Sequence, residues 1–408
     1  MKIRPFILVL LLLLGLTACS KAGSESSATP NQSTRLTAEA LFVPTDTPVQ
    51  VTATPRSTEV EAALEDSITW MQKAVRERDY EAYMAYVWDG DPVFWTEQSR
   101  WARDWEDNPL AAFEMRLSRI QALSDDTAIA RLTIEWKQEN QDLASGATAS
   151  VVFHREGERW LYGGEYWETV DLADGQIRLF YFANELTDNR GAAENVQEYL
   201  PNIYTRLTTE FDYSPQQPAY LKLYDLPVTL QTFTRMSKQG INTWNEPGEA
   251  IKMTLINTNT APREQHVARE YTRFMLFDMT VGSRENIPWW LEAGIVEFGA
   301  VVRFDEQNSM INYTAGLTTA RENDTNQLLD WTALGETPDW TQYEPEDVSI
   351  QGFTLIRYIT DEFGSEQRNA WIQAIAAGTA LDDATQTHLG ISFGRLNTGW
   401  RDWLAERA

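Results

Sequence analysis

Cysteine is nearly missing from this sequence of 408 residues, which contains only Cys19. A single cysteine cannot form a disulfide within the chain, so stability has to come from buried apolar side chains. Glycine-rich phosphate-binding loops and the short motifs of serine or cysteine nucleophiles are missing as well. These absences exclude a disulfide-stabilised scaffold, P-loop nucleotide chemistry and a recognisable serine or cysteine hydrolase.

Basic residues are also scarce. Lysine and arginine total 34 against 60 aspartates and glutamates, which gives a formal net charge of -26. A surface of this charge repels nucleic acid and anionic lipid headgroups, so we expect no nucleic-acid partner. A solvated acidic surface is the plainest interpretation, and a charged partner would have to be basic.

Long apolar runs are missing except at the start of the chain. Lys2 and Arg4 precede an apolar run over residues 6–16. This run is shorter than the roughly 20 apolar residues that a membrane-spanning helix needs. A positive start followed by a short apolar run is typical of a secretory signal peptide, which we place at residues 1–18.

The apolar run ends in Leu-Thr-Ala-Cys at residues 16–19, which resembles the lipobox of bacterial lipoproteins. The resemblance implies cleavage before Cys19 and lipidation of its thiol, with acyl chains such as palmitate. An ordinary signal peptide with a chance cysteine is the alternative. Residues 19–57 are rich in Ser, Thr, Pro and Ala, a composition that buries too little apolar surface to fold. We therefore expect a lipidated tether that holds the folded part at the outer face of the cytoplasmic membrane.

The remaining length predicts two domains, residues 58–172 and 173–408. The first domain opens with an apolar helical pattern after Thr58, a candidate N-cap, and continues with a short helix at 79–83. Period-two alternation over 130–137 and a hairpin over 151–162 then predict antiparallel strands. Helices followed by a curled antiparallel sheet make an α+β domain.

The first domain resembles the nuclear transport factor 2-like (SnoaL-like) cone fold. The resemblance lies in the opening helix, the charged turn Arg78-Asp79, and the closing segment Arg-Trp-Leu-Tyr at 159–162. Members of that fold can be enzymes, ligand pockets or spacers. No convergent acid–base pair is present in this region, so we assign no chemistry to it.

The second domain begins near Gly175 with apolar strand patterns at 176–182, 219–224 and 251–256, and a helical pattern at 192–211. Helical patterns follow to the C-terminus. No internal repeat occurs at solenoid periods. The second domain is therefore also α+β, with a small sheet and a mainly helical C-terminal part.

Two segments of the second domain carry most of the functional information. Residues 265–274 read Gln-His-Val-Ala-Arg-Glu-Tyr-Thr-Arg-Phe, and residues 287–298 read Ile-Pro-Trp-Trp-Leu-Glu-Ala-Gly-Ile-Val-Glu-Phe. They resemble the active-site helices of gluzincin metallopeptidases, the thermolysin-like class also called peptidase MA-like. In that family two histidines at i and i+4 bind zinc, the adjacent glutamate is the general base, and a glutamate of the second helix is the third ligand. Residues 352–404 resemble the helical tail of the same peptidases, which extends the resemblance over roughly residues 175–408.

The first helix departs from this pattern at both histidines. The resemblance places Arg269 at the first histidine, Glu270 at the general base and Arg273 at the second histidine. A guanidinium has no lone pair and stays protonated in proteins, so neither arginine can bind zinc.

The second helix departs from the pattern at the third ligand. Trp290 and Gly294 align with the family, which puts Ala293 at the position of the ligand glutamate and Glu292 one residue before it. The resemblance therefore implies a peptidase scaffold without catalytic zinc, and we expect neither a metal nor another cofactor.

Other interpretations of these residues stay open. The two arginines lie one helical turn apart and could form a solvated stripe, and Trp289 and Trp290 could be core or cleft wall. His266 and Glu270 are also at i and i+4, but a rearranged metal site has no third ligand at a known spacing.

We expect a membrane-tethered lipoprotein that binds a peptide, a protein or an envelope component in the former peptidase cleft, through Arg269, Glu270, Arg273, Trp290 and Glu292. The arginines would neutralise the carboxylates of Glu270, Glu292 and Glu297 and keep donors for an anionic group such as a peptide C-terminus. An active zinc metallopeptidase with an atypical ligand set is the alternative. A small ligand in the cone-like domain is a third hypothesis.

Overall fold

The computed structural model describes residues 55–184, 186–255, 263–280, 283–302, 310, 328–331, 334 and 344–407. All of them belong to one compact unit, residues 53–408. The predicted signal peptide, Cys19 and the tether as far as residue 54 lie outside the described residues. Within the described part of the chain, no helix combines the length and apolar character needed to span a membrane.

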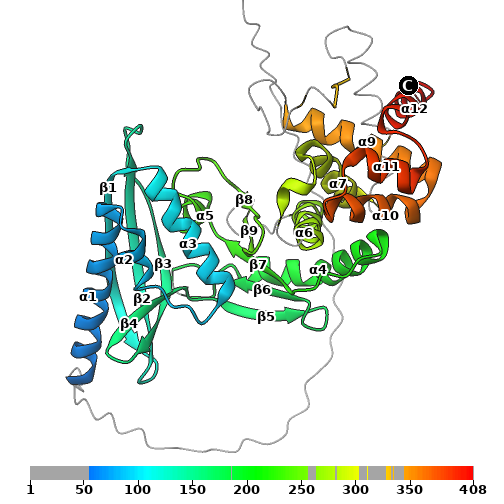
Figure 1. Ribbon diagram of the computed structural model, residues 1–408. Coiled ribbons are helices and arrows are strands. Elements are labelled where there is room, and N and C mark those ends of the chain that lie inside the picture. The colour runs from blue at the N-terminus through cyan, green and yellow to red at the C-terminus, as the bar shows by residue number, and fades with distance from the viewer. Residues whose placement is uncertain are drawn as a thin grey trace, which may run out of the picture. The chain divides into compact units, whose positions relative to one another are not determined.

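The N-terminal part has helices before a sheet, as predicted (Figure 1). The helices are α1 (Pro55–Glu77), α2 (Tyr80–Met84) and α3 (Pro92–Asp107). The strands pair antiparallel in the order β1-β2-β3-β4 and are β1 (Leu110–Ala122), β2 (Thr127–Gln138), β3 (Ser145–Glu156) and β4 (Arg159–Glu165). Helix α1 begins before Thr58, so the expectation that Thr58 is an N-cap is wrong. Helix α2 does have a side-chain cap, because Asp79 accepts a hydrogen bond from the backbone of Ala82.

Alternation along β2 explains why one face of this sheet is buried. Ala130, Leu132, Ile134 and Trp136 are at most 3% exposed, while the residues between them face the other side. Helix α1 covers the buried face with its apolar stripe, in which Leu64 and Met71 are fully buried.

The second sheet is mixed and has five strands in the order β5-β6-β7-β9-β8. They are β5 (Glu168–Leu172), β6 (Ile177–Tyr181), β7 (Ala219–Tyr224), β8 (Thr243–Trp244) and β9 (Ile251–Thr254). Strands β6, β7 and β9 are parallel, and β8 forms an antiparallel hairpin with β9. The connections contain α4 (Arg190–Phe211) between β6 and β7, and α5 (Pro227–Thr234) after β7. The strand predicted at 251–256 ends at Thr254, and residue 256 lies outside the described residues.

The C-terminal part is helical. Its helices are α6 (Glu264–Met279), α7 (Trp289–Val301), α9 (Pro345–Phe363), α10 (Ser365–Ala376), α11 (Leu381–Leu389) and α12 (Phe393–Ala405). Helices α7 and α9 approach closely at two glycines, where a Cβ on Gly294 would lie 2.5 Å from the backbone of Gly352. Both parts of the structure are therefore α+β, which confirms the predicted fold class.

The buried apolar side chains form two cores. One core belongs to the second sheet and the C-terminal helices. The other lies under the first sheet, and it includes side chains that follow residue 172, namely Phe182, Tyr224, Leu230, Phe233 and Met236. Helix α5 packs against β3, and the indole nitrogens of Trp101 and Trp136 donate hydrogen bonds to the backbone and the hydroxyl of Thr232. The predicted boundary at residues 172 and 173 therefore does not separate the two cores.

Candidate functional site

Helix α6 presents one polar stripe and one apolar stripe. Val267 and Tyr271 are buried in the core, as is Ala268. The remaining positions at helical spacing carry polar side chains, namely His266, Arg269, Glu270 and Arg273. A Cβ on Gly299 of α7 would clash with Thr272, so the glycine lets α6 and α7 pack closely. This close packing brings the polar stripe of α6 next to the glutamates of α7.

Arg273 connects two carboxylates, one on each helix. Its Nη1 donates to Oε2 of Glu270 at 2.5 Å, and its Nε donates to Oε1 of Glu292 at 3.2 Å. Glu270 is 4% exposed and Glu292 is 6% exposed. The far side of Glu292 is held by Arg284, whose Nε lies 3.2 Å from Oε2. Arg284 comes from the short 3-10 helix Arg284–Asn286 that precedes α7.

Arg269 makes the second link between α6 and α7. Its Nε and Nη2 both donate to Oε2 of Glu297, at 3.0 and 2.6 Å. Glu297 is 5% exposed. We call the six side chains of this assembly the Arg–Glu network, which comprises Arg269, Glu270, Arg273, Arg284, Glu292 and Glu297.

The Arg–Glu network is layered. The side chains of its three glutamates are 6–8% exposed, whereas those of Arg269 and Arg273 are 27% and 24% exposed and that of Arg284 is 50% exposed. The three arginines and three glutamates have no net formal charge, but the carboxylates are buried and the guanidiniums lie closer to the solvent. Among the described residues, Nη1 of Arg269 and Nη2 of Arg273 have no hydrogen-bond partner. The surface of the network therefore offers N–H donors.

The environment fixes the protonation of two side chains. Burial on its own would lower the pKa of Arg273, but the adjacent carboxylates of Glu270 and Glu292 outweigh it and raise that pKa. Burial lowers the pKa of His266, and the positive charges of Arg269 and Arg263 lower it further. At neutral pH the network therefore contains a permanent cation at 273 and a neutral imidazole at its edge.

The donor set of this site does not fit a zinc ion. The resemblance placed arginines at both histidine ligands, and the nitrogens of a guanidinium all carry protons. The carboxylates of Glu270, Glu292 and Glu297 are each bonded to a guanidinium, and Ala293 packs against the core. No set of three or more His, Cys, Asp or Glu side chains with a geometry for metal binding occurs within the described part of the chain.

Of the two interpretations of Trp290, ligand contact and core or cleft wall, the structure supports the core. Its side chain is 4% exposed and stacks on Trp331, with ring centroids 4.5 Å apart. Phe393 of α12 lies on it at 6.0 Å. Trp290 is thus a core residue that packs α7 against the C-terminal helices.

Asn245 is a neighbour of the site that sequence reasoning did not find. Its Nδ2 donates to the backbone oxygen of Glu270 at 2.7 Å and lies 3.3 Å from the carboxylate. Asn245 follows strand β8 and is 25 positions from Glu270 in the sequence. No local pattern marks such a contact, because it depends on where the hairpin meets the helix. Arg284 was missed for the same reason.

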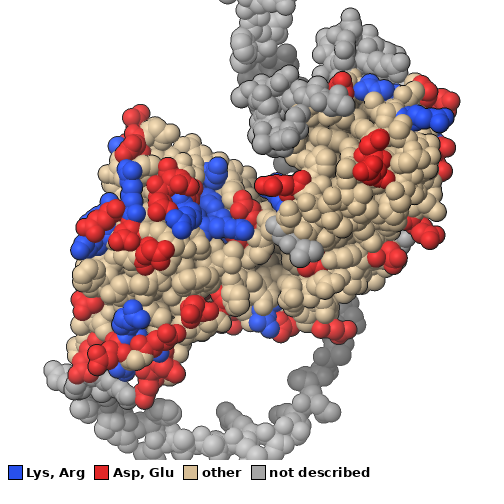
Figure 2. Space-filling model, viewed as in Figure 1, with Lys and Arg blue, Asp and Glu red and all other residues tan. Residues whose placement is uncertain are grey.

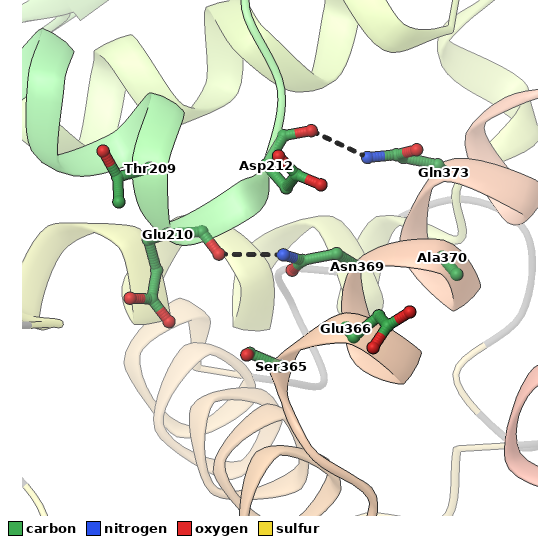
Figure 3. A pocket seen from close by; sticks show the side chains of 8 residues that line it. All are labelled: Thr209, Glu210, Asp212, Ser365, Glu366, Asn369, Ala370 and Gln373. Carbon is green, nitrogen blue, oxygen red and sulfur yellow. Dashed lines mark hydrogen bonds between the residues drawn. The ribbon is translucent and has the colours of Figure 1, made fainter.

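A separate pocket of about 340 Å³ lies where the end of α4 meets the start of α10 (Figure 3). Asn369 Nδ2 donates to the backbone oxygen of Glu210 at 2.9 Å, and Gln373 donates to the backbone of Asp212. The Glu210 carboxylate is already paired with Arg368 at 2.9 Å. These contacts join two helices and give this pocket no chemistry that we can assign.

The surface charges agree with the composition. Figure 2 shows acidic and basic side chains interspersed on the face in view, without a large basic area. Exposed side chains of opposite charge also form ion pairs: Arg116 of β1 pairs with Glu114 and Glu135, and Lys73 of α1 pairs with Glu77. Such mixed pairs are typical of a solvated surface.

Comparison with known proteins assigns a family to the part of the chain that contains the Arg–Glu network. No curated protein matches the chain. Among solved structures, the chain resembles an NTF-2-like protein of unknown function from Shewanella oneidensis at 13% identity, over 25% of this chain and 93% of that one, with a TM-score of 0.23. The model of the Peptidase MA superfamily matches residues 202–406, which is half of the chain and includes helices α6 and α7. The chain belongs to the Peptidase MA superfamily.

Proposed function

We propose that this protein is a lipid-anchored, extracytoplasmic member of the superfamily that binds the anionic end of a peptide or protein and does not hydrolyse it. The observation that carries the proposal is the Arg–Glu network, in which Arg269 and Arg273 occupy the positions that the resemblance assigns to zinc ligands. Without zinc there is no zinc-bound water for Glu270 to activate.

The layering of the network supports an anionic ligand. The side chains of Arg269 and Arg273 are more exposed than those of the glutamates they bind, so a carboxylate at this surface would meet guanidinium donors. Charge-assisted hydrogen bonds from arginine to carboxylate are stronger than neutral ones. The glutamates underneath hold the guanidiniums in place, which lowers the entropy that a ligand has to remove.

The location rests on the sequence alone. The lipobox-like residues 16–19 and the tether up to residue 57 support attachment through a lipid on Cys19 and a position outside the cytoplasmic membrane. In that location a peptide, a protein or an envelope component could supply the anionic group.

Two peptide pools that differ only at the C-terminus test the binding proposal. One pool carries free carboxylates, and the other carries amides in otherwise identical sequences. We expect retention of the carboxylate pool on the immobilised full-length protein, and loss of that retention in the Arg269→Gln, Arg273→Gln double variant. Equal retention of both pools would contradict the proposed role of the arginines. Unchanged retention of the carboxylate pool on the double variant would contradict it as well.

A further inference from the structure

The N-terminal part contacts the surroundings of the Arg–Glu network through a cluster of buried charges. Glu97 of α3 lies between two lysines of neighbouring parallel strands, Lys222 of β7 and Lys252 of β9, at 2.5 and 3.0 Å. All three side chains are at most 7% exposed. Because unpaired charges at this depth are costly, the position of α3 relative to β7 and β9 is specified by these contacts.

The same helix also holds the loop of the β8–β9 hairpin, residues 245–250. Arg100 donates to Glu249 at 3.0 Å and contacts Glu246 at 3.4 Å. Oε1 of Glu97 accepts a hydrogen bond from the backbone of Ala250 at 3.0 Å. The loop is thus attached to α3 at three of its six residues.

The loop is fixed from its other side as well. Glu249 is 5% exposed and binds Lys252 at 2.6 Å and Arg235 at 2.5 Å. Arg235 lies over the ring of Trp244, the last residue of β8, at 5.2 Å. Burial raises the pKa of Glu249, but Lys252 and Arg235 outweigh it and the pKa ends below its ordinary value. The carboxylate that anchors the loop is therefore charged at neutral pH.

The first residue of the loop reaches the Arg–Glu network. Asn245 donates to the backbone and approaches the carboxylate of Glu270, the glutamate that Arg273 binds. A continuous set of contacts therefore runs from α3 through the loop to α6. Helix α5 also joins the two parts, because it packs against β3 and Thr232 accepts hydrogen bonds from Trp101 and Trp136.

We infer that the N-terminal α+β part serves as a positioning element for the α6–α7 site. Glu97 and Arg100 fix the position of the loop 245–250, and the loop fixes the position of Glu270 through Asn245. This role does not depend on the proposed ligand. It makes Glu97, Arg100 and Asn245 positioning residues.

Amide hydrogen exchange of the full-length protein tests the inference, with Arg100→Gln as the variant. Arg100 is 35% exposed, so its loss should leave the fold intact while it frees Glu246 and weakens the hold on Glu249. Arg103→Gln is the matched control, because Arg103 lies on the same helix and its partners, Glu106 of α3 and the ring of Tyr80 of α2, do not belong to the loop. We expect exchange in residues 243–252 and around Glu270 to rise about threefold or more in Arg100→Gln, and to stay unchanged in the control.

A second variant distinguishes an effect of Arg100 that is confined to the loop from one that reaches α6 through Asn245. In an Asn245→Ala background the loop no longer contacts Glu270, so Arg100→Gln should still speed exchange in the loop but should add nothing in α6. Increased exchange in the loop with no change in α6 of the Arg100→Gln single variant would overturn the inference. So would equal effects of Arg100→Gln on α6 with and without Asn245. Neither result depends on whether a peptide binds.

Discussion

Arg273 on α6 donates from Nε to Oε1 of Glu292 on α7 across 3.2 Å, and this contact joins the two helices at the place where the peptidase resemblance puts a metal ion. Zinc in such a site is coordinated by side chains of both helices, so the ion holds the two helices together. Here opposite charges make the link. Both glutamates that Arg273 contacts are buried. The guanidinium therefore neutralises buried charge and contributes to the stability of the fold.

The first prediction concerns the stability of the Arg–Glu network. Arg273→Ala leaves the buried carboxylates of Glu270 and Glu292 with fewer donors, and a quarter of the arginine side chain is exposed, so the expected loss is about 2–3 kcal/mol. Arg284→Ala removes a half-exposed partner and should cost about 0–1 kcal/mol. Denaturant unfolding measures both. Near-zero loss for Arg273→Ala would mean that the arginines are an ordinary solvated stripe.

The second prediction restores metal ligands. In the triple variant Arg269→His, Arg273→His, Ala293→Glu, the positions that the resemblance assigns to the zinc ligands carry two imidazoles and a carboxylate. We expect zinc to raise the unfolding temperature of this variant, because a ligand that binds only the native state stabilises it. The control carries glutamine in place of each histidine and should not respond. A triple variant that zinc leaves unchanged would show that α6 and α7 do not follow the peptidase register.

The third prediction concerns acid. Burial raises the pKa of Glu97, but Lys222 and Lys252 outweigh it and lower the pKa from its ordinary value of 4.5 to about 2. A carboxyl with a depressed folded-state pKa stabilises the protein above its unfolded-state pKa, and that stability is lost as the pH falls from about 4.5 to about 2. Glu97→Gln should therefore cost about 3 kcal/mol at pH 7 and progressively less towards pH 2, where the difference nearly vanishes.

The control for the acid experiment is Glu114→Gln on the exposed side of β1, whose side chain is 45% exposed. Unfolding by urea at several pH values gives the comparison. A Glu97→Gln penalty that is constant between pH 7 and pH 3 would mean that the carboxylate is not held by the two lysines.

The fourth prediction concerns the anchor. Cys19→Ser removes the thiol that the lipobox resemblance identifies as the lipid acceptor, and the protein should move from the membrane fraction to the soluble fraction. Metabolic labelling with palmitate should give a labelled wild-type band and an unlabelled variant. Membrane retention of the variant, together with an unlabelled wild type, would contradict lipid anchoring.

Much of the site was visible in the sequence because it lies on two helices with a family pattern. The spacing of Arg269, Glu270 and Arg273 was enough to predict that the arginines neutralise the glutamates of the next helix, and the ion pairs agree with that prediction. The sequence left open whether Trp290 lies in the core or at the cleft wall, since an aromatic side chain in a motif does not reveal which one it faces, and the structure places it in the core. Asn245 could not be found, because its contact depends on the tertiary position of a hairpin loop.

The fold was predictable where one periodicity dominated a segment, as in α1, β2 and α4. Helix α3 was missed although Asp91 and Pro92 form a normal helix start, with the Asp91 side chain accepting from Val93 and Phe94. Its buried face contains charged and polar residues such as Glu97 and Gln98, which blur an apolar stripe. Glu97 is buried because it pairs with Lys222 of β7 and Lys252 of β9, and Gln98 accepts a hydrogen bond from the hydroxyl of Tyr83. A pattern of apolar residues carries no information about such partners.

The zinc content of the purified full-length protein tests the central claim most directly. The protein is produced in zinc-supplemented medium, freed of loosely bound metal by gel filtration, and analysed by elemental mass spectrometry. The account predicts far less than one zinc per chain, because Arg269 and Arg273 have no lone pair for the metal and Glu270, Glu292 and Glu297 are bonded to guanidiniums. About one zinc per chain, lost on chelation together with peptide hydrolysis that Glu270→Gln also abolishes, would contradict it.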